Sequence, residues 1–131
     1  MASNTSRTIK ALKEQGMKPW IVEKFNRFGG EFGIRQDLYG IIDVIALNYE
    51  TGVVGVQCCS GSGYTSHMTK ILEEHRQDTI DWLKTPGCSL ELWAWRKLKV
   101  KRGGKAYRWV PRIQEITMTQ ILERDKQIEG D

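Results

Sequence analysis

The sequence predicts an α/β fold in which a central mixed β-sheet is flanked by helices, and three observations lead to this prediction. Two almost wholly apolar runs, residues 38–47 and 53–59, are joined by the turn-forming segment NYETG and are typical of strands covered on both faces. Residues 65–84 carry apolar side chains at helical spacing. Residues 90–98 and 106–116 can pair as a hairpin across a Gly-Gly turn. A sheet with helices on its faces is the simplest arrangement that buries these segments.

The N-terminal quarter of the chain contributes a helix, a strand and a loop to this order. Ser6 can cap a helix over residues 7–15. Residues 20–25 mix apolar and charged side chains in rough alternation, which indicates a short strand. Residues 26–33 are rich in glycine, and we expect a loop that bends sharply.

Length and composition predict one domain over residues 1–131. With 131 residues, of which 40% are hydrophobic and 27% charged, the chain can build one compact core of ordinary globular composition. A last short helix is predicted at residues 119–127, and residues 129–131 are expected to fray.

The sequence also predicts a reduced, cytoplasmic environment without membrane association. No segment approaches the roughly 20 apolar residues that span a bilayer, and the N-terminus lacks the apolar region of a secretion signal. The cysteines, Cys58, Cys59 and Cys88, are odd in number and include an adjacent pair, which makes a poor disulfide. Together with two scattered histidines they do not supply four zinc ligands at a recognisable spacing.

Positive charge is concentrated in the predicted C-terminal hairpin. The net charge of the chain is +4, and the segment from Arg96 to Arg112 contains no acid. Its basic residues are Arg96, Lys97, Lys99, Lys101, Arg102, Lys105, Arg108 and Arg112. Aromatic residues lie among and beside them, namely Trp93, Trp95, Tyr107 and Trp109. Such a ribbon can follow the phosphates of DNA while its aromatic side chains pack or stack. The alternative is a solvated hairpin whose aromatic residues fill the core.

Asp43 is the one charged residue within the apolar run 38–47, and Gln57 lies near the end of its predicted hairpin partner. Burying an ionised carboxylate without a partner is costly, so something is expected to compensate Asp43. A metal ion is one such partner. The structural alternatives are hydrogen bonds from loop amides or an ion pair with Arg35.

A second acid, Asp37, precedes Asp43 in the segment RQDLYGIID. Hard divalent cations such as Mg²⁺ take one or two carboxylates together with water and phosphate oxygens. Asp37, Asp43 and the amide oxygen of Gln57 could provide this set, and Mn²⁺ could substitute for Mg²⁺. Equally, Asp37 could begin a turn and form a surface ion pair with Arg35.

The segment DVIAL, followed by a turn and then GVVGVQCC, resembles the strand-hairpin core of the PD-(D/E)xK nucleases, particularly the archaeal-type Holliday junction resolvases. The longer pattern RQDLYGIIDVIAL, GVQCCS, a helix, WL and a W-R-K hairpin is similar to small phage proteins of this fold and spans residues 20–116. The resemblance implies a restriction-endonuclease-like core with the element order α-β-β-β-α-β-β. It also implies that Asp43 and Gln57 occupy the two positions of the acidic part of the family motif.

The chain departs from the family pattern at two positions. Cys59 stands where the family has the lysine that positions the attacking water, and a cysteine carries no fixed positive charge. Lys70 on the following helix, with Arg35 behind it, is therefore the candidate replacement, while the plain alternative is a solvated helix residue. The family also carries a glutamate on its first helix, at a place that falls near Thr5 here, whereas Glu14 lies elsewhere on that helix.

These observations lead to the hypothesis of a magnesium-dependent, structure-selective DNA endonuclease of the resolvase type. Its candidate catalytic residues are Asp43, Gln57, Asp37, Lys70 and Arg35, of which the first three would hold the metal. His67, beside the flexible segment SGSG, could act as a base or a phosphate ligand, or be a polar residue at a helix start.

The expected partner is DNA, including branched DNA, bound through the basic hairpin. A four-way junction presents two strands related by symmetry, so a homodimer is expected by analogy. If the chain is viral, its location would be the host cytoplasm. Two alternatives stay open: a DNA-binding protein that retains the nuclease fold without catalysis, and an interaction module whose basic hairpin docks an acidic protein.

Overall fold

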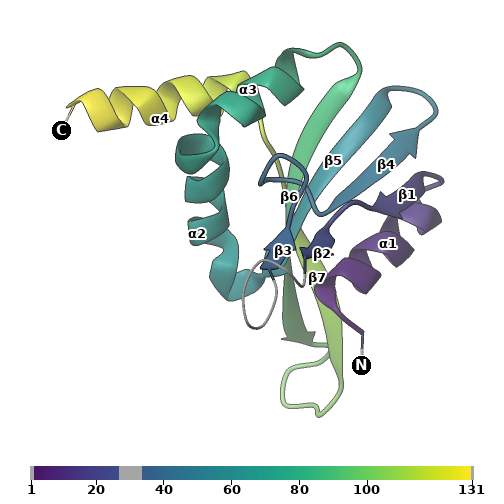
Figure 1. Cartoon of the computed structure of the whole chain (residues 1–131). Coiled ribbons are helices and arrows are strands. Elements are labelled where there is room, and N and C mark those ends of the chain that lie inside the picture. Colours follow the sequence, from purple (N-terminus) through teal and green to yellow (C-terminus); the bar gives the residue numbers. More distant parts are fainter. Residues whose placement is uncertain (1, 27–33, 131) are drawn as a thin grey trace.

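A computed structural model of the chain describes residues 2–26 and 34–130 (Figure 1). The elements of the first half are α1 (Asn4–Glu14), β1 (Lys18–Ile21), β2 (Lys24–Asn26), β3 (Ile34–Gln36), β4 (Val44–Asn48) and β5 (Gly52–Ser60). The second half contains a 3₁₀ turn (Gly61–Gly63), α2 (Tyr64–Thr69), a π-helical segment (Lys70–Glu74), α3 (Arg76–Lys84), β6 (Cys88–Lys99), β7 (Tyr107–Glu115) and α4 (Met118–Gly130). Among the described residues no helix is long and apolar enough to cross a bilayer.

The predicted α/β architecture is confirmed: five strands form a mixed sheet in the order β1-β4-β5-β6-β7. The pairs β4–β5 and β6–β7 are antiparallel hairpins, as the sequence predicts. β5 and β6 are parallel, and such a pair needs a long crossover, which the segment from α2 to α3 provides. β2 and β3 form a separate two-stranded sheet.

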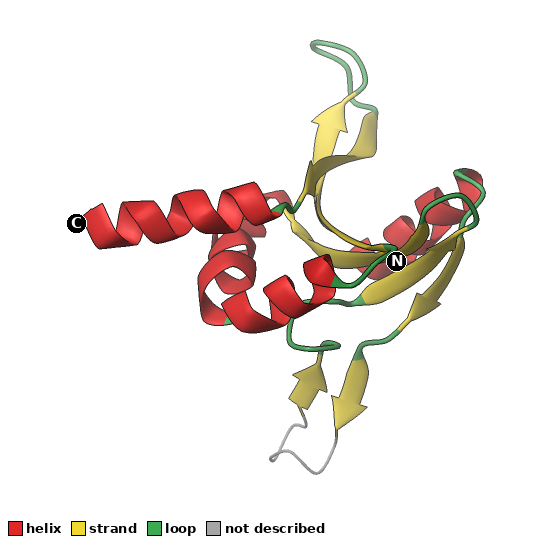
Figure 2. Cartoon of the chain, turned by 90° about the horizontal axis from the view of Figure 1, so that it is seen from above, coloured by secondary structure: helices red, strands yellow, loops and turns green. Residues whose placement is uncertain are grey.

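Helices lie on both faces of the large sheet (Figures 1 and 2). On one face α1 packs Leu12 against a cluster that includes Val56, Trp93 and Trp95. On the other face the segment from α2 to α4 covers a second cluster that includes Leu92 and Ile71. Because side chains alternate along a strand, consecutive residues of β5 and β6 serve the two faces in turn.

Three boundaries differ from the predictions for physical reasons. α1 begins earlier than predicted because Ser3, not Ser6, is the N-cap, and the two serines form a reciprocal capping box. Residues 20–25 do not form one strand, since β1 ends at Ile21 and β2 begins at Lys24. The predicted loop at residues 26–33 lies outside the described residues except for Asn26, which ends β2.

The apolar run 38–47 is not a continuous strand. Residues 38–42 form a tight turn, and β4 begins only at Val44. Ile41 and Ile42 are fully buried within this turn, so burial rather than strand geometry explains their apolar character. The predicted helix 65–84 is likewise divided by the π-helical segment, and α4 is longer at both ends than residues 119–127.

Candidate functional site

The turn between β3 and β4 brings Asp37 and Asp43 together. Within it, the backbone N–H of Leu38 donates to the carbonyl of Ile42 at 2.8 Å, and that of Gly40 donates to the carbonyl of Asp37 at 3.1 Å. Tyr39 and Gly40 both have positive φ, 55° and 74°, which allows the chain to reverse at this point. The two acids therefore lie at the two ends of a closed loop.

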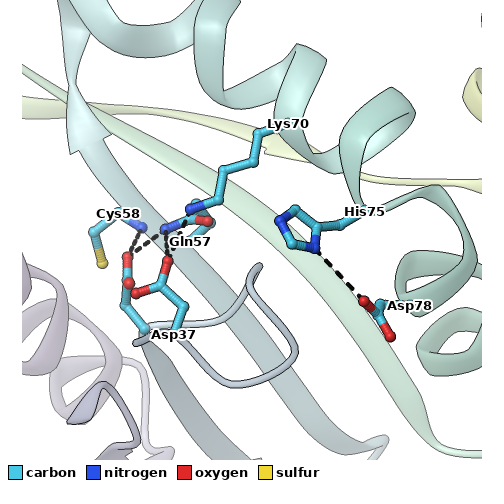
Figure 3. Close-up of polar contacts among 7 residues, drawn as sticks. Asp37, Gln57, Cys58, Lys70, His75 and Asp78 are labelled. Atoms are coloured by element: carbon cyan, nitrogen blue, oxygen red, sulfur yellow. Dashed lines mark hydrogen bonds and ion pairs between the residues drawn. The ribbon is translucent and has the colours of Figure 1, made fainter. Parts of the chain in front are cut away.

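Gln57 of β5 lies between the two carboxylates. Its Nε2 donates to Asp43 Oδ2 at 2.6 Å and to Asp37 Oδ2 at 3.3 Å (Figure 3). The backbone N–H of Cys58 donates to the same Asp43 oxygen at 2.8 Å. Asp43 is 6% exposed and Gln57 is 1% exposed, so this is a polar cluster inside the protein.

Lys70 reaches the cluster from the helical layer above the sheet. Its Nζ lies 3.0 Å from Asp37 Oδ2, and Figure 3 shows the side chain extending toward Asp37. Lys70 opens the π-helical segment, in which the N–H of His75 donates to the Lys70 carbonyl at 2.8 Å. π-helical turns are frequent at functional sites, and here the turn lies at the residue that contacts Asp37.

Glu23 is a site residue that the sequence analysis missed. One carboxylate oxygen from each of Glu23, Asp37 and Asp43 lies within 4.8 Å of the others. The N–H groups of Val22 and Glu23 both donate to the Asp43 carbonyl, at 2.9 and 3.2 Å, just beyond the β1–β4 pairing. Predicting that pairing would have indicated Glu23, because Ile21 pairs with Val44, so the residues that follow β1 lie near Asp43, which precedes β4.

The three acids and Gln57 line a cleft of about 370 Å³ at the N-terminal end of α1, while Lys70 lines a different hollow that also includes Asp37. Its lining residues are Ser3, Asn4, Thr5, Glu23, Asp37, Asp43, Gln57, Cys58 and His67. Thr5 thus lies at the cleft without providing the acid that the family carries on its first helix, and Glu14 is not among the lining residues. His67 has a buried Nδ1 without a hydrogen-bond partner among the described residues, and burial, followed by the charge of Lys70, lowers its pKa.

The two central acids have different pKa values. Burial, reinforced by the hydrogen bond with Asp37, raises the pKa of Asp43 to about 8. Burial also acts to raise the pKa of Asp37, but hydrogen bonds with Asp43 and Lys70 outweigh it, and the net pKa of Asp37 is lowered. Near neutral pH the two carboxyl groups therefore share one proton.

The cluster has the chemistry of a site for a hard divalent cation. Such ions take oxygen ligands, and Glu23, Asp37 and Asp43 offer carboxylate oxygens. The Gln57 amide nitrogen donates to both aspartates and so occupies the position between the carboxylates where a cation would bind. Its Oε1 is buried without a hydrogen-bond partner among the described residues. Turning the amide over would direct this oxygen toward the carboxylates, where an ion could use it.

Two further positions were singled out in the sequence: Cys59, where the family has its lysine, and the predicted catalytic residue Arg35. Cys59 is 6% exposed and packs in the core beneath the helical layer. Burial raises its pKa to about 11, so it is an uncharged thiol at neutral pH. The Arg35 side chain lies outside the described part of the structure, and its predicted role stays a prediction.

The basic hairpin extends beyond the body of the sheet (Figure 1). Its predicted DNA-binding residues are all exposed: Arg96, Lys97, Lys99, Lys101, Arg102, Lys105 and Arg108. Side chains alternate between the two faces of a strand, so Lys97 and Lys99 lie on the same face of β6 as the buried Trp93 and Trp95, which is the face that α1 covers. Their partners on β7, Trp109 and Tyr107, lie on that face too. Arg96, Arg108 and Arg112 lie on the opposite side, where the Arg112 guanidinium lies 3.6 Å from the ring centre of Tyr64 in α2.

A scan against protein-family models finds no match for this chain, and searches of curated proteins and of solved structures also find no significant match. The functional conclusions below therefore depend on the geometry of the site.

Proposed function

We propose that this protein is a divalent-metal-dependent DNA endonuclease with a PD-(D/E)xK-type site. One observation carries the proposal: three carboxylates meet around a buried amide in one cleft, and the ammonium group of Lys70 lies against one of them, Asp37. A metal ion that hydrolyses a phosphodiester needs oxygen ligands, and these three carboxylates offer them.

The order of elements supports a restriction-endonuclease-like core. α1, the antiparallel strands β1, β4 and β5, a helical crossover and the parallel strand β6 follow one another, with β7 at the edge. The small β2–β3 sheet is an insertion in this scheme. Asp43 stands directly before β4 and Gln57 lies in β5, as the resemblance implies.

A Mg²⁺ or Mn²⁺ ion, when bound, would activate water and polarise the scissile phosphate. Asp37, Asp43 and Glu23 would hold it, with Gln57 as an additional oxygen ligand. Lys70 would place a positive charge beside the attacked phosphate, taking the part of the family lysine from the helix instead of from β5. His67, with its lowered pKa, would be neutral and able to accept a proton at the mouth of the cleft.

The basic hairpin supports DNA as the substrate. Its charged side chains are exposed and belong to β6 and β7, while the cleft lies at the end of the neighbouring strand β5. Duplex DNA bound along the hairpin could thus extend over the cleft. Preference for branched DNA and a homodimeric state belong to the same proposal, by analogy with resolvases.

The second candidate is a DNA-binding protein that has lost catalysis. The buried, uncharged thiol of Cys59 at the motif position favours it, because no cation stands there. In this case the Lys70–Asp37 ion pair would be purely structural.

A nicking assay on branched and linear DNA with Mg²⁺ or Mn²⁺ separates the two candidates. The endonuclease proposal predicts metal-dependent cutting that Asp43→Asn abolishes. DNA binding with steep salt dependence but no cutting supports the second candidate, and cutting that survives Asp43→Asn contradicts the proposed site. If neutralising Lys99, Lys101 and Arg102 together leaves DNA affinity unchanged, the hairpin is instead a candidate docking surface for an acidic protein.

A further inference from the structure

A second hollow lies on the other side of the first turn of α1. It is a groove of about 470 Å³ between α1 and the basic hairpin. Its lining includes two basic residues, Arg7 and Lys10, one acid, Glu14, and the indoles of Trp95 and Trp109. The volume is in the range of small-ligand pockets, about 300–1,000 Å³.

Trp109 differs from the buried tryptophans that share its face of the hairpin. Trp93 and Trp95 are 1% and 6% exposed and belong to the core, whereas Trp109 is 44% exposed. The Arg7 guanidinium lies 3.7 Å from the ring centre of Trp109. Arg7 thus covers one face of the Trp109 ring, while the rest of the residue remains partly open to solvent.

Tyr107 continues this surface toward the hairpin tip. It is 49% exposed, and Lys97 Nζ lies 4.8 Å from its ring centre. β7 is the edge strand of the sheet, and Tyr107 and Trp109 are two residues apart on one face. Two partly exposed rings in a row, each with a cation over one face, match an arrangement in which bases stack on aromatic rings or on an arginine plane and phosphates are bound by charge.

The groove adjoins the cleft through α1. Ala2, Ser6 and Arg7 line the groove, while Ser3, Asn4 and Thr5 line the cleft. Both hollows therefore border the same helical turn, and one nucleic-acid strand could pass from the first to the second.

We propose that Trp109, Tyr107, Arg7 and Lys10 form a binding site for unpaired nucleotides, so that the protein takes a single-stranded segment of nucleic acid into the groove beside the cleft. Duplex DNA does not fit this surface, because its bases are stacked on one another and do not offer their faces to an aromatic ring. The opposite side of the hairpin, with Arg96, Arg108 and Arg112, has the charge to contact the backbone of a duplex.

The inference deepens the proposed function by naming a substrate with a single-stranded segment, yet it depends only on binding. All measurements are therefore made in EDTA. If metal-dependent cutting is not observed, the binding measurements in EDTA remain valid. If the binding measurements fail, the proposal of a metal site is not affected.

The test compares binding of a roughly 15-nucleotide oligothymidylate with binding of a duplex of the same length, followed by fluorescence anisotropy. Trp109→Ala should weaken oligothymidylate binding roughly tenfold while changing duplex binding by no more than about twofold. Trp109→Phe should retain most of the affinity because it keeps a stacking ring. Trp20→Ala is the matched control, since Trp20 is 71% exposed on β1 and belongs to neither hollow.

A fluorescence titration provides a second test that does not depend on correct folding of the alanine variant. Oligothymidylate should quench the tryptophan emission of the wild-type protein, and Trp109→Phe should remove most of the quenching without loss of binding. Quenching that persists in Trp109→Phe overturns the inference. So does a Trp109→Ala variant that melts like the wild type but binds oligothymidylate equally well, or loses duplex and oligothymidylate binding to the same extent.

Discussion

Acidic residues cluster in two regions of this protein, and the two clusters differ in how their negative charge is balanced. Near α4, Arg76 binds Asp125 through Nε and a terminal nitrogen at 2.6–3.1 Å, and Arg124 pairs with Glu73. Each of these acids faces its own arginine, and the pairs join α4 to the preceding helical segments. Around Gln57, in contrast, carboxylate oxygens of Glu23, Asp37 and Asp43 lie within 4.8 Å of one another, and Lys70 pairs with Asp37.

This difference indicates which of the two clusters stabilises the fold. Paired charges at a partly exposed helix interface contribute modestly to stability and need no further partner. Buried carboxylates close to one another oppose folding unless a proton or a cation neutralises them. The cluster around Gln57 is therefore expected to reduce stability in the free protein and to gain it when a cation binds.

The largest expected effect is on catalysis. Lys70→Met should reduce the rate of metal-dependent cutting by about 100-fold or more, because the charge beside the phosphate is lost. Lys84→Met is the control, since Lys84 also forms an ion pair, with Asp81 at 3.3 Å, but lies on α3 away from the cleft. Initial nicking rates measure both variants, and equal rates for Lys70→Met and the wild type would show that Lys70 is only structural.

The second effect is on stability and depends on pH. The Asp43 pKa is about 8 in the folded protein and close to 3.8 when unfolded, so between these values the folded state binds the additional proton. The free energy of unfolding must then decrease as pH rises from about 4 to about 8. Asp37, with its lowered pKa, acts in the opposite direction, at pH values below about 4.

Asp43→Asn removes this dependence without changing the shape of the side chain. In metal-free buffer at pH 8 it should raise the free energy of unfolding by roughly 2–5 kcal/mol, where the upper figure is the full effect of the pKa shift, and the difference from wild type should shrink toward pH 4. Urea unfolding at several pH values measures it. A variant that is less stable than wild type at pH 8 would mean that Asp43 is a structural hydrogen-bond acceptor.

The smallest effect is expected at α4. Arg124→Ala should lower the free energy of unfolding by about 1 kcal/mol or less, and added salt should reduce the difference. Cutting rates should not change, because neither Arg124 nor its partner Glu73 lines the cleft. Loss of cutting in this variant would show that the two acidic regions are coupled.

The sequence predicted the parts of the site in which a polar residue stands out within an apolar segment. The sequence alone shows a charged residue in an apolar run and an amide near the end of its hairpin partner. In the structure these two residues, Asp43 and Gln57, are hydrogen-bonded. Lys70 was found because the resemblance required a cation and the next helix offered one. The five-stranded sheet followed from the same strand patterns.

The parts that were missed depend on tertiary packing. Within residues 38–42, Ile41 and Ile42 are buried although they lie in a turn, and an apolar run in the sequence does not distinguish such a turn from a strand. Glu23 enters the site only through the pairing of β1 with β4. The π-helical segment at Lys70 has no local sequence signature, and it is recognisable only from the hydrogen bond that spans five residues to His75.

The central claim is that the carboxylates around Gln57 bind a divalent cation. The most direct test is a calorimetric titration of the DNA-free protein with Mn²⁺, carried out on the wild type, on Asp43→Asn and on Asp78→Asn, whose acid lies on α3 near His75. We predict saturable binding that Asp43→Asn abolishes and Asp78→Asn leaves intact. Binding that is the same in all three proteins, or absent from the wild type, would contradict the claim.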